Sequence, residues 1–363
     1  MNTSPPHSAF PGRGASINPP NRFERLHLAA APDCPSGTDE WDDARPSPRT
    51  QFYHDTTTSL LTHNDSPDVG FAYGLNAYRG CEHGCAYCFA RPYHEFLGWS
   101  SGLDFETKIL VKLRAPALLR AELSAKRWQA QPIAMSGATD CYQPAERQFR
   151  LTRGCLEVCA ELRHPIFIIT KNALVTRDLD ILTELARHNC IGVHVSVTSL
   201  DPDLAGKLEP RASRPAARLR AIKELSAAGI PVGVMVAPTI PGLTDHEMPA
   251  ILEAAAEAGA KGAGYVLLRL PFSVKDVFSR WLDDHEPGKK ARILDRIRVL
   301  RGGQLTTSEW GKRMTGDGIF AEQLRALFEV TTRRLGLNQE HFALSTDRFR
   351  KPGEQLGLGL ELG

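Results

Sequence analysis

From about residue 70 onward, short apolar runs rich in β-branched residues alternate with segments of helical periodicity. We expect strands at residues 74–78, 133–136, 166–170, 191–198, 232–237 and 265–270. We expect helices between them at residues 116–129, 151–163, 177–188, 215–228 and 246–257. Strands that alternate with helices predict parallel βαβ units with right-handed crossovers. The predicted fold class is therefore α/β.

The repeat alone fits two architectures, a partial barrel or an open doubly wound sheet, because six units are too few for a closed eight-unit barrel. In the fourth predicted strand, valines alternate with polar residues that include Ser196 and Thr198. If the valine face packs on helices, the polar face points inward and lines a cavity. We therefore predict a partial TIM-like barrel of six βα units, (β/α)6, with extra C-terminal helices.

The amino-acid composition divides the chain outside the strand–helix repeat into further regions. Residues 1–50 hold nine of the 25 prolines, which favours an irregular arm, although residues 12–14 and 22–25 are candidates for docking on the main body. The predicted regions are an N-terminal arm at 1–68, a barrel core at 69–272, a helical region at 273–350 and a flexible tail at 351–363. An amphipathic helix at 319–335 is expected to cover the open side of the barrel.

The overall composition is that of a soluble globular protein, with 42% hydrophobic and 24% charged residues in a chain of 363. A net charge of +2 permits a nucleic-acid partner without demanding one. No window reaches the roughly 18 apolar residues of a membrane span, and residues 1–32 lack the apolar core of a secretory signal. Eight cysteines in such a chain indicate a reducing compartment, so we expect a cytoplasmic protein without membrane contact.

Three cysteines, Cys81, Cys85 and Cys88, form a CxxxCxxC arrangement in one short stretch. Three thiolates on one loop can bind three irons of a cubane cluster and leave the fourth iron without a protein ligand. A zinc site needs a fourth ligand at tetrahedral spacing, and no second CxxC or HxxxH pair follows in the sequence. The spacing favours an iron–sulfur site, with zinc or unpaired thiols as alternatives.

This stretch, with the aromatic Tyr87 before its third cysteine, resembles the radical S-adenosylmethionine (SAM) superfamily. The resemblance implies a 4Fe–4S cluster and SAM as cofactors, reductive cleavage of SAM to a 5′-deoxyadenosyl radical, and hydrogen abstraction from a substrate. A flavodoxin or ferredoxin is then expected as electron donor. Residues 76–81, 136–140, 168–178 and 199–211 resemble the spore-photolyase-like DNA-repair branch, which makes nucleic acid a candidate substrate.

The same resemblance implies a set of cofactor-binding positions at the carboxyl ends of the predicted strands. The implied SAM-binding residues are Tyr87, Ser136, Gly137, Thr139, Asp140, Lys171, Ser196, Thr198, Arg211 and Pro238. Each has an ordinary alternative, since Ser and Thr cap helices, Asp and Pro form turns, and Lys and Arg are commonly solvated.

The remaining cysteines carry less information. Spore photolyases have a hydrogen-donating cysteine directly after the serine of the second strand's loop, whereas here Gly137 stands there and Cys141 follows four residues later. Cys141 is a candidate donor only if its loop curls back, which puts thymine-dimer repair in doubt. Cys155 and Cys159 share one helical face and are expected to pack. Cys34 and Cys190 are expected to be incidental.

Two other classes of function stay open at this point. A non-catalytic iron–sulfur protein for electron transfer or redox sensing would need a fourth ligand, for which Cys141 or His83 are the candidates. A nucleic-acid binding module ranks last, because no recognised binding signature is present. For an enzyme, Tyr265 and Arg269 share a face of the sixth predicted strand and are candidates for the substrate entrance. The sequence does not indicate an oligomeric state.

Overall fold

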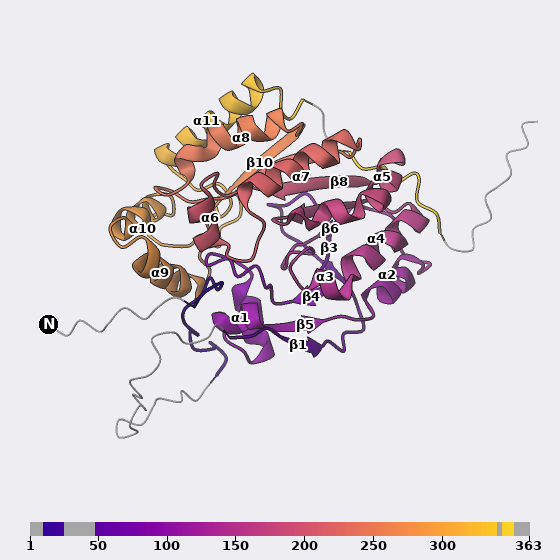
Figure 1. The fold of residues 1–363 in the computed structure, drawn as a ribbon, viewed down its shortest axis with the longest axis horizontal. Coiled ribbons are helices and arrows are strands. Elements are labelled where there is room, and N and C mark those ends of the chain that lie inside the picture. Colours follow the sequence, from indigo (N-terminus) through magenta and orange to yellow (C-terminus); the bar gives the residue numbers. More distant parts are fainter. Residues whose placement is uncertain (1–9, 25–47, 340–342, 352–363) are drawn as a thin grey trace, which may run out of the picture.

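The computed structural model describes residues 10–24, 48–339 and 343–351, and a seven-stranded sheet lies at its centre (Figure 1). In spatial order its strands are β2 (Leu61–His63), β3 (Tyr73–Leu75), β6 (Ile133–Met135), β7 (Ile166–Thr170), β8 (Ile191–Ser196), β9 (Val232–Thr239) and β10 (Gly262–Leu267). Each of the six predicted strands has a counterpart, but two differ from the expected bounds. The run at 74–78 is divided between β3 and β4 (Tyr78–Arg79) of a second sheet, and the last strand begins and ends three residues earlier than expected.

The order of the strands distinguishes the two architectures that the sequence left open. From β3 to β10 each strand pairs in parallel with the next, and only β2 joins antiparallel to β3. A doubly wound sheet reverses its strand order at a central switch point, whereas a barrel keeps sequence order. Within the described residues, the end strands β2 and β10 do not pair with each other. The prediction of a partial barrel is confirmed.

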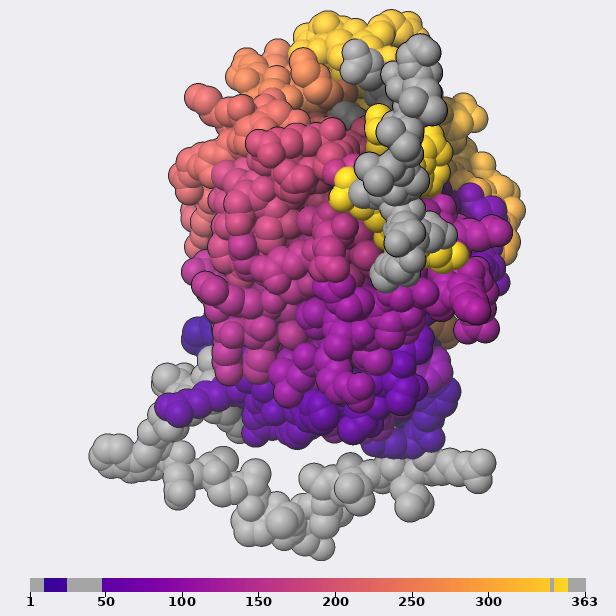
Figure 2. All heavy atoms as spheres, turned by 90° about the vertical axis from the view of Figure 1, so that its right-hand side faces the viewer, coloured from indigo at the N-terminus to yellow at the C-terminus, as the bar shows by residue number. Residues whose placement is uncertain are grey.

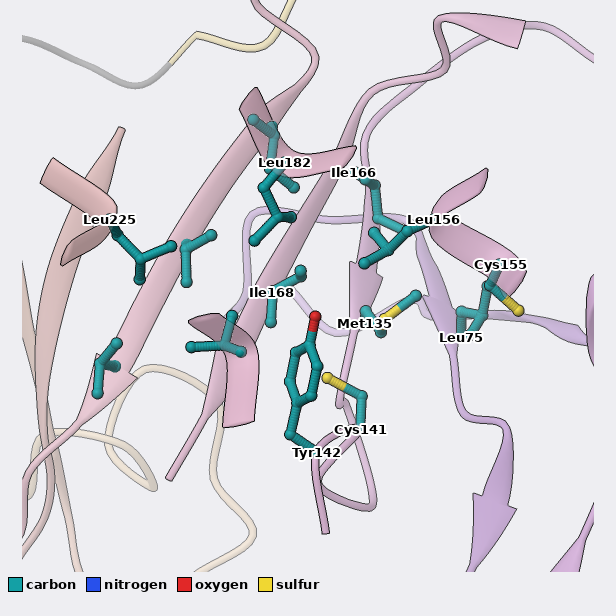
Figure 3. Close-up of a cluster of buried hydrophobic side chains, with 14 of the residues drawn as sticks. Leu75, Met135, Cys141, Tyr142, Cys155, Leu156, Ile166, Ile168, Leu182 and Leu225 are labelled. Carbon is teal, nitrogen blue, oxygen red and sulfur yellow. The ribbon is translucent and has the colours of Figure 1, made fainter. Parts of the chain in front are cut away.

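Helices follow the strands at nearly the expected positions. Helix α2 (Ala115–Leu123) follows β5 (Lys108–Val111), and α3 (Glu146–Phe149) and α4 (Leu151–Leu162) follow β6. The 3₁₀ helix η2 (Ala173–Asp178) and α5 (Leu179–Arg187) follow β7, and α6 (Pro202–Leu208) and α7 (Pro215–Ala227) follow β8. The 3₁₀ helix η3 (Asp245–Glu247) and α8 (Met248–Glu257) follow β9. Pro202 and Pro215 begin α6 and α7, where a missing N–H costs no helical hydrogen bond. The valines of β8 lie in the main core with apolar residues of the helices, among them Leu156, Leu182 and Leu225, which Figure 3 labels.

A second, three-stranded sheet lies beside the barrel, in the order β1 (Gln51–His54), β5 and β4 (Tyr78–Arg79). Strands β1 and β2 fall within the predicted N-terminal arm, and the sequence pattern indicated none of β1, β2 or β5. The four side chains of β1 are all exposed, so that strand carries no apolar alternation to detect. The loop after β4 holds the three cysteines and leads into the 3₁₀ helix η1 (Arg91–Leu97) and α1 (Leu103–Thr107).

The last helices are α9 (Val274–His285), α10 (Lys290–Val299) and α11 (Ile319–Arg334). Helix α11 lies along α8 and the edge strand β10 (Figure 1), where the rings of Phe328 and Tyr265 are 4.8 Å apart. The side chain of Asn338 completes this edge, because it accepts a hydrogen bond from Ala263 N at 2.7 Å and donates one to Ala263 O at 3.0 Å. Covering an edge in this way prevents its pairing with other strands.

Residues 343–351 run across the opposite end of the barrel from the cysteines. Ser345 N donates to Asn189 O at 2.8 Å, just before β8, and Arg350 N donates to Leu162 O at 2.7 Å, just before β7. In Figure 2 this yellow segment lies on the face formed by the magenta part of the chain. Within the described ranges, no helix has the length and apolar character needed to cross a membrane.

Candidate functional site

The cysteine loop is a compact, buried segment without regular structure. Cys81 and Cys85 are each 7% exposed, and Cys88 is partly buried. Cys81 N donates to Phe105 O at 2.9 Å, and Cys88 N donates to Cys85 O at 3.2 Å. Burial raises the pKa of Cys81 and Cys85, and the nearby carboxylates raise it further, Asp140 for Cys81 and Glu209 for Cys85.

The three thiols fit a cubane cluster. In the part of the chain that the structure describes, no three His, Cys, Asp or Glu side chains converge closely enough to hold a single metal ion. A cubane needs no such convergence, because each thiolate binds a separate iron. The two candidates for a fourth ligand are already engaged or turned away. His83 has Nδ1 3.3 Å from Asp140 Oδ2 and Nε2 3.1 Å from Asn172 Nδ2, and Cys141 lies in the core (Figure 3).

A buried carboxylate, Glu209, connects the cysteine loop to the ends of β8 and α7. It accepts hydrogen bonds from the hydroxyls of Tyr87 and of Thr198, the latter at 2.7 Å, and it pairs with Arg218 and with Lys171. Burial alone would raise the pKa of Glu209, but Arg218, Lys171 and the Tyr87 hydrogen bond hold it well below the usual range. Glu209 is therefore an anion with two cationic partners.

Lys171 stands where three strand ends meet. Its Nζ donates to Ala237 O at 2.6 Å and to Thr198 Oγ1 at 3.3 Å, and lies 3.3 Å from Glu209 Oε1. It also lies 5.8 Å from the centre of the Tyr87 ring. Ala237 precedes Pro238 at the end of β9. The structure thus brings together four predicted cofactor-binding residues: Tyr87, Lys171, Thr198 and Pro238.

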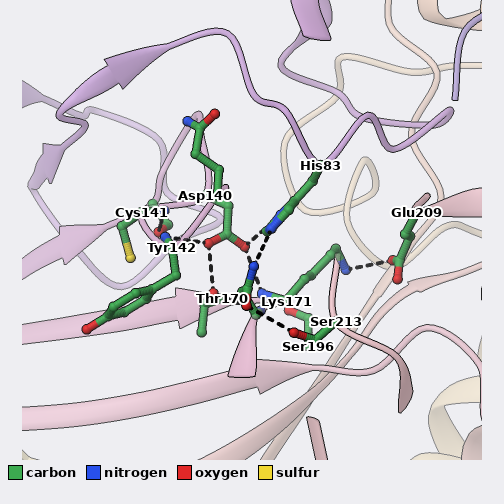
Figure 4. Close-up of polar contacts among 12 residues, drawn as sticks. His83, Asp140, Cys141, Tyr142, Thr170, Lys171, Ser196, Glu209 and Ser213 are labelled. Atoms are coloured by element: carbon green, nitrogen blue, oxygen red, sulfur yellow. Dashed lines mark hydrogen bonds and ion pairs between the residues drawn. The ribbon is translucent and has the colours of Figure 1, made fainter. Parts of the chain in front are cut away.

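Asp140 holds a second group of contacts (Figure 4). Its Oδ1 accepts from Thr170 Oγ1 at 2.7 Å and from Tyr142 N at 2.9 Å, and its Oδ2 accepts from Lys171 N at 2.7 Å and faces His83. Burial alone would raise its pKa, but the charge and hydrogen bond of His83 and those from Lys171 and Thr170 lower it. Because the carboxylate faces protein donors on both oxygens, Asp140 positions the strand-end loops around it.

The loop after β6 contains the other predicted residues of this region. Asn76 Oδ1 accepts from Ala138 N at 2.9 Å and from Thr139 N at 3.1 Å, which fixes the turn. Ser136 has a φ of 83°, in the left-handed region, and its hydroxyl accepts from Cys141 N at 2.9 Å. A Cβ at Gly137 would meet no atom closer than 3.9 Å, so this position tolerates a side chain and lies beside open space.

Cys141 lies apart from the cluster cysteines. Its side chain packs in the main core with Met135 and Tyr142 (Figure 3), and burial raises its pKa well above the ordinary value. The hydrogen-donor role considered for Cys141 gains no support from this geometry. Cys155 and Cys159 are fully buried in the same core, as expected for packing residues.

Arg211 and Ser196 make contacts that the sequence did not indicate. The Arg211 guanidinium lies 3.0 Å from Glu82 Oε1 and 3.0 Å from Thr50 Oγ1, so it joins the cysteine loop to the N-terminal region. Ser196 ends β8, and its carbonyl accepts from Arg218 at 3.0 Å. Cys190 lies just before β8 in the core, and Cys34 lies outside the described residues.

Glu209 and Arg218 are the site residues that the sequence analysis missed. One signal was present: Arg218 stands three or four residues before Ala221 and Ile222, on the buried face of α7. A charged residue at such a position needs a buried partner. The partner, Glu209, lies only nine residues before Arg218, but its contact with Tyr87, 122 residues away, has no local signal.

A group of exposed aromatic rings and partly buried arginines lies beside the cysteine loop, and one of the arginines, Arg313, forms an ion pair with Asp68. The Arg269 guanidinium is 5.5 Å from the ring centre of Phe89, which is 41% exposed, and that of Arg313 is 3.8 Å from the ring centre of Trp310. Burial, and then Arg313, lower the pKa of Arg269. Tyr265 packs against Phe328 of α11 instead of sharing this surface.

The chain is similar to several known proteins. A family model described as the radical SAM superfamily matches residues 75–255. An uncharacterised protein of Mycobacterium tuberculosis is 39% identical over 240 residues, which are 66% of this chain and 70% of that protein. An uncharacterised protein of Methanocaldococcus jannaschii is 30% identical over 187 residues, which are 51% of this chain and 66% of that protein.

Solved structures show the same fold. A variant of spore photoproduct lyase has a TM-score of 0.58 at 16% identity and covers 79% of this chain and 80% of its own. Another variant, solved with bound AdoMet and dinucleoside spore photoproduct, has a TM-score of 0.56 at 15% identity over the same shares. A partial barrel, a CxxxCxxC loop at the carboxyl ends of its strands and the family match lead to one conclusion: the chain belongs to the radical SAM superfamily.

Proposed function

We propose that the protein is an enzyme that binds a 4Fe–4S cluster through Cys81, Cys85 and Cys88 and binds SAM beside it. The observation that carries the proposal is the position of Lys171 and Thr198 against Tyr87 of the cysteine loop. When bound, the cluster supplies the electron that cleaves SAM to a 5′-deoxyadenosyl radical, which abstracts hydrogen from the substrate.

The chain's own residues bind and orient SAM in this proposal. Lys171 supplies a positive charge for the methionine carboxylate of SAM. It is free to do so because Glu209 keeps its other cationic partner, Arg218. Thr198 and Ser196 are the candidates for hydroxyl contacts with the ribose, and the backbone at Pro238 lines the adenine. Asp140 holds the loops that carry these groups and does not itself need to touch SAM.

The substrate that the exterior supports best is a nucleic acid. Phe89 and Trp310 are about half exposed and each lies beneath an arginine guanidinium, Arg269 or Arg313. Aromatic rings stack on bases, and arginines meet phosphates and strengthen stacking. The likeness of fold to a spore photoproduct lyase solved with a dinucleoside adds support. With Gly137 at the donor position of that enzyme, we propose a reaction that uses no thiol donor in this loop.

We also propose a flavodoxin or ferredoxin as the electron donor and the reducing cytoplasm as the compartment. Both follow from the cofactor, because a low-potential cluster needs a low-potential reductant and free thiols need reducing conditions. Seven described cysteines are unpaired, which suits that environment.

The test is reconstitution without oxygen, followed by addition of dithionite and SAM. We expect 5′-deoxyadenosine in the wild-type reaction and none in Cys81→Ala. Cys155→Ala, which removes a buried thiol from the core, should retain product formation. No product from a protein with a verified 4Fe–4S cluster would refute the proposal. Electron paramagnetic resonance adds an independent measurement: SAM should change the spectrum of the reduced cluster, and an unchanged spectrum would favour a fully ligated electron carrier.

The substrate class is tested by binding. A fluorescent single-stranded oligonucleotide should bind with a salt-dependent affinity, and Arg269→Ala should weaken that binding about tenfold or more while SAM cleavage persists. Lys223→Ala removes a lysine on α7, outside the aromatic and basic group, and serves as the charge-matched control. Equal affinity for the wild type and Arg269→Ala would exclude this surface as the nucleic-acid site.

A further inference from the structure

The N-terminal segment lies directly on the cysteine loop. Residues 12–21, here called the N-terminal strap, run beside α1 and reach α9, where Ser16 Oγ donates to Asp284 Oδ2 at 2.8 Å (Figure 1, indigo). At Gly14 the approach is so close that a Cβ would lie 1.6 Å from Gly84 O. Gly84 lies between Cys81 and Cys85 and has a φ of 66°. Only glycine fits where strap and loop meet.

A fully buried carboxylate, Glu106, fastens the strap to the loop. Its Oε2 accepts from Gly14 N at 3.1 Å, and its Oε1 accepts from Ala15 N at 2.9 Å and from Arg91 Nη2 at 2.8 Å. Arg13 adds a contact from the strap, because its Nη1 donates to Glu106 O at 2.9 Å. Glu106 and Arg91 are each 0% exposed, so this pair has no water to replace a lost partner.

Arg91 carries the connection into the cysteine loop. Its Nε donates to Cys85 O at 2.9 Å and its Nη2 to Gly84 O at 3.2 Å, while its Nη1 donates to Gly102 O at 2.8 Å. The guanidinium thereby binds two carbonyls of the loop and the carboxylate that binds the strap. A loop without regular structure has few hydrogen bonds of its own, so these bonds fix its backbone.

The strap is separate from the main hydrophobic core of the barrel. Among the described residues of the segment 10–24, none belongs to that core. Its contacts go instead to the loop, η1, α1 and α9, including Leu103 N to Ile17 O at 3.2 Å and Asn21 Nδ2 to Glu95 O at 2.8 Å. Loosening the strap should therefore affect the cysteine loop without unfolding the barrel.

We infer that the N-terminal strap is part of the cluster site: through Glu106 and Arg91 it holds the cysteine loop in its cluster-binding conformation and shields it from solvent. Glu106, Arg91 and Gly14 act as positioning residues, since Arg91 and Gly14 meet the loop backbone and Glu106 acts through both of them. The inference rests on the proposed cluster. It deepens that proposal by extending the site to a segment about 70 residues before the cysteines.

The test compares Glu106→Gln and Gly14→Ala with matched controls in the full-length chain. Glu161→Gln changes a surface carboxylate paired with Arg120, and Gly70→Ala places a Cβ where no atom lies within 4 Å. After anaerobic reconstitution, the measured quantity is the half-life of the cluster's visible absorbance during exposure to air or a chelator. We expect Glu106→Gln and Gly14→Ala to shorten it about tenfold or more, and the controls to match the wild type.

Two further measurements separate a positioning role from general loss of structure. In the apo protein, amide hydrogen exchange at residues 84–88 should accelerate in Glu106→Gln, while exchange in β7 and β8 stays as in the wild type. Far-ultraviolet circular dichroism should show an unchanged barrel. Equal cluster half-lives and equal exchange for Glu106→Gln and the wild type would overturn the inference. A wild-type protein that holds no cluster would instead overturn the proposed function.

Discussion

Replacement of Asp140 by asparagine tests the central role of its carboxylate. Backbone donors face both oxygens of Asp140, Tyr142 N at Oδ1 and Lys171 N at Oδ2. An asparagine presents one oxygen and one NH2 group, so in either orientation its NH2 group meets a backbone N–H and leaves it unpaired. A buried unpaired N–H costs about 1–3 kcal/mol, and replacing charged by neutral hydrogen bonds at the other oxygen adds about 1 kcal/mol. We expect a loss of about 2–4 kcal/mol in the free energy of unfolding.

Urea denaturation followed by circular dichroism measures this loss, and Asp180→Asn is the matched control. Asp180 pairs with Arg153 at the surface, where its side chain is 62% exposed, so its replacement should cost less than about 1 kcal/mol. Because Asp140 binds Lys171 N, Asp140→Asn should also weaken SAM binding. A stability within about 0.5 kcal/mol of the wild type would refute the argument that the carboxylate is saturated by protein donors.

Three shorter predictions concern buried charges and a buried histidine. Burial lowers the pKa of His164 to about 4, so the unfolded chain takes up a proton first as the pH falls. The contribution of His164 to the free energy of unfolding is complete above about pH 6.5 and decreases by about 2 kcal/mol by about pH 5. In urea denaturation, the stability of His164→Gln should therefore decrease less over this pH range than that of the wild type. Lys171→Met should weaken SAM binding by about 10- to 100-fold in equilibrium dialysis at unchanged iron content. Arg218→Met should destabilise the fold by about 3–5 kcal/mol in urea, because Glu209 loses a wholly buried partner.

The sequence predicted the barrel well, because the parallel strands carry short runs rich in β-branched and apolar residues that alternate with helical segments. The prediction failed at the end of β10, because the apolar run at 265–270 continues beyond Leu267, the last residue of β10 that pairs with β9. Leu268 and Leu270 lie beyond the strand and pack in a separate core with Phe278 and Trp281 of α9. Hydrophobicity indicates burial, but it does not show where strand pairing stops.

The candidate site was predicted only as far as local motifs reach. The cysteine spacing and the strand-end residues Lys171 and Thr198 are visible in short windows of sequence. The role of the carboxylates is not, because the contacts that tie them to the cysteine loop and to the N-terminal segment are distant in the chain: Glu106 binds Ala15 across 91 residues, and Glu209 binds Tyr87 across 122. An isolated acidic residue has the appearance of a surface charge, and only tertiary structure reveals its burial.

The two cations of Glu209 differ in a way that explains how the site receives a ligand. Arg218 is 1% exposed at its side chain and also donates to the carbonyls of Ser196 and Ser213, so it stays with the carboxylate. Lys171 is 16% exposed and has a flexible side chain. Glu209 is one anion with two cationic partners, so the group has one positive charge in excess. The lysine can turn toward an incoming carboxylate while Glu209 stays paired with Arg218. The fixed pair thus maintains the structure, and the lysine remains available for the role in SAM binding that we propose for it.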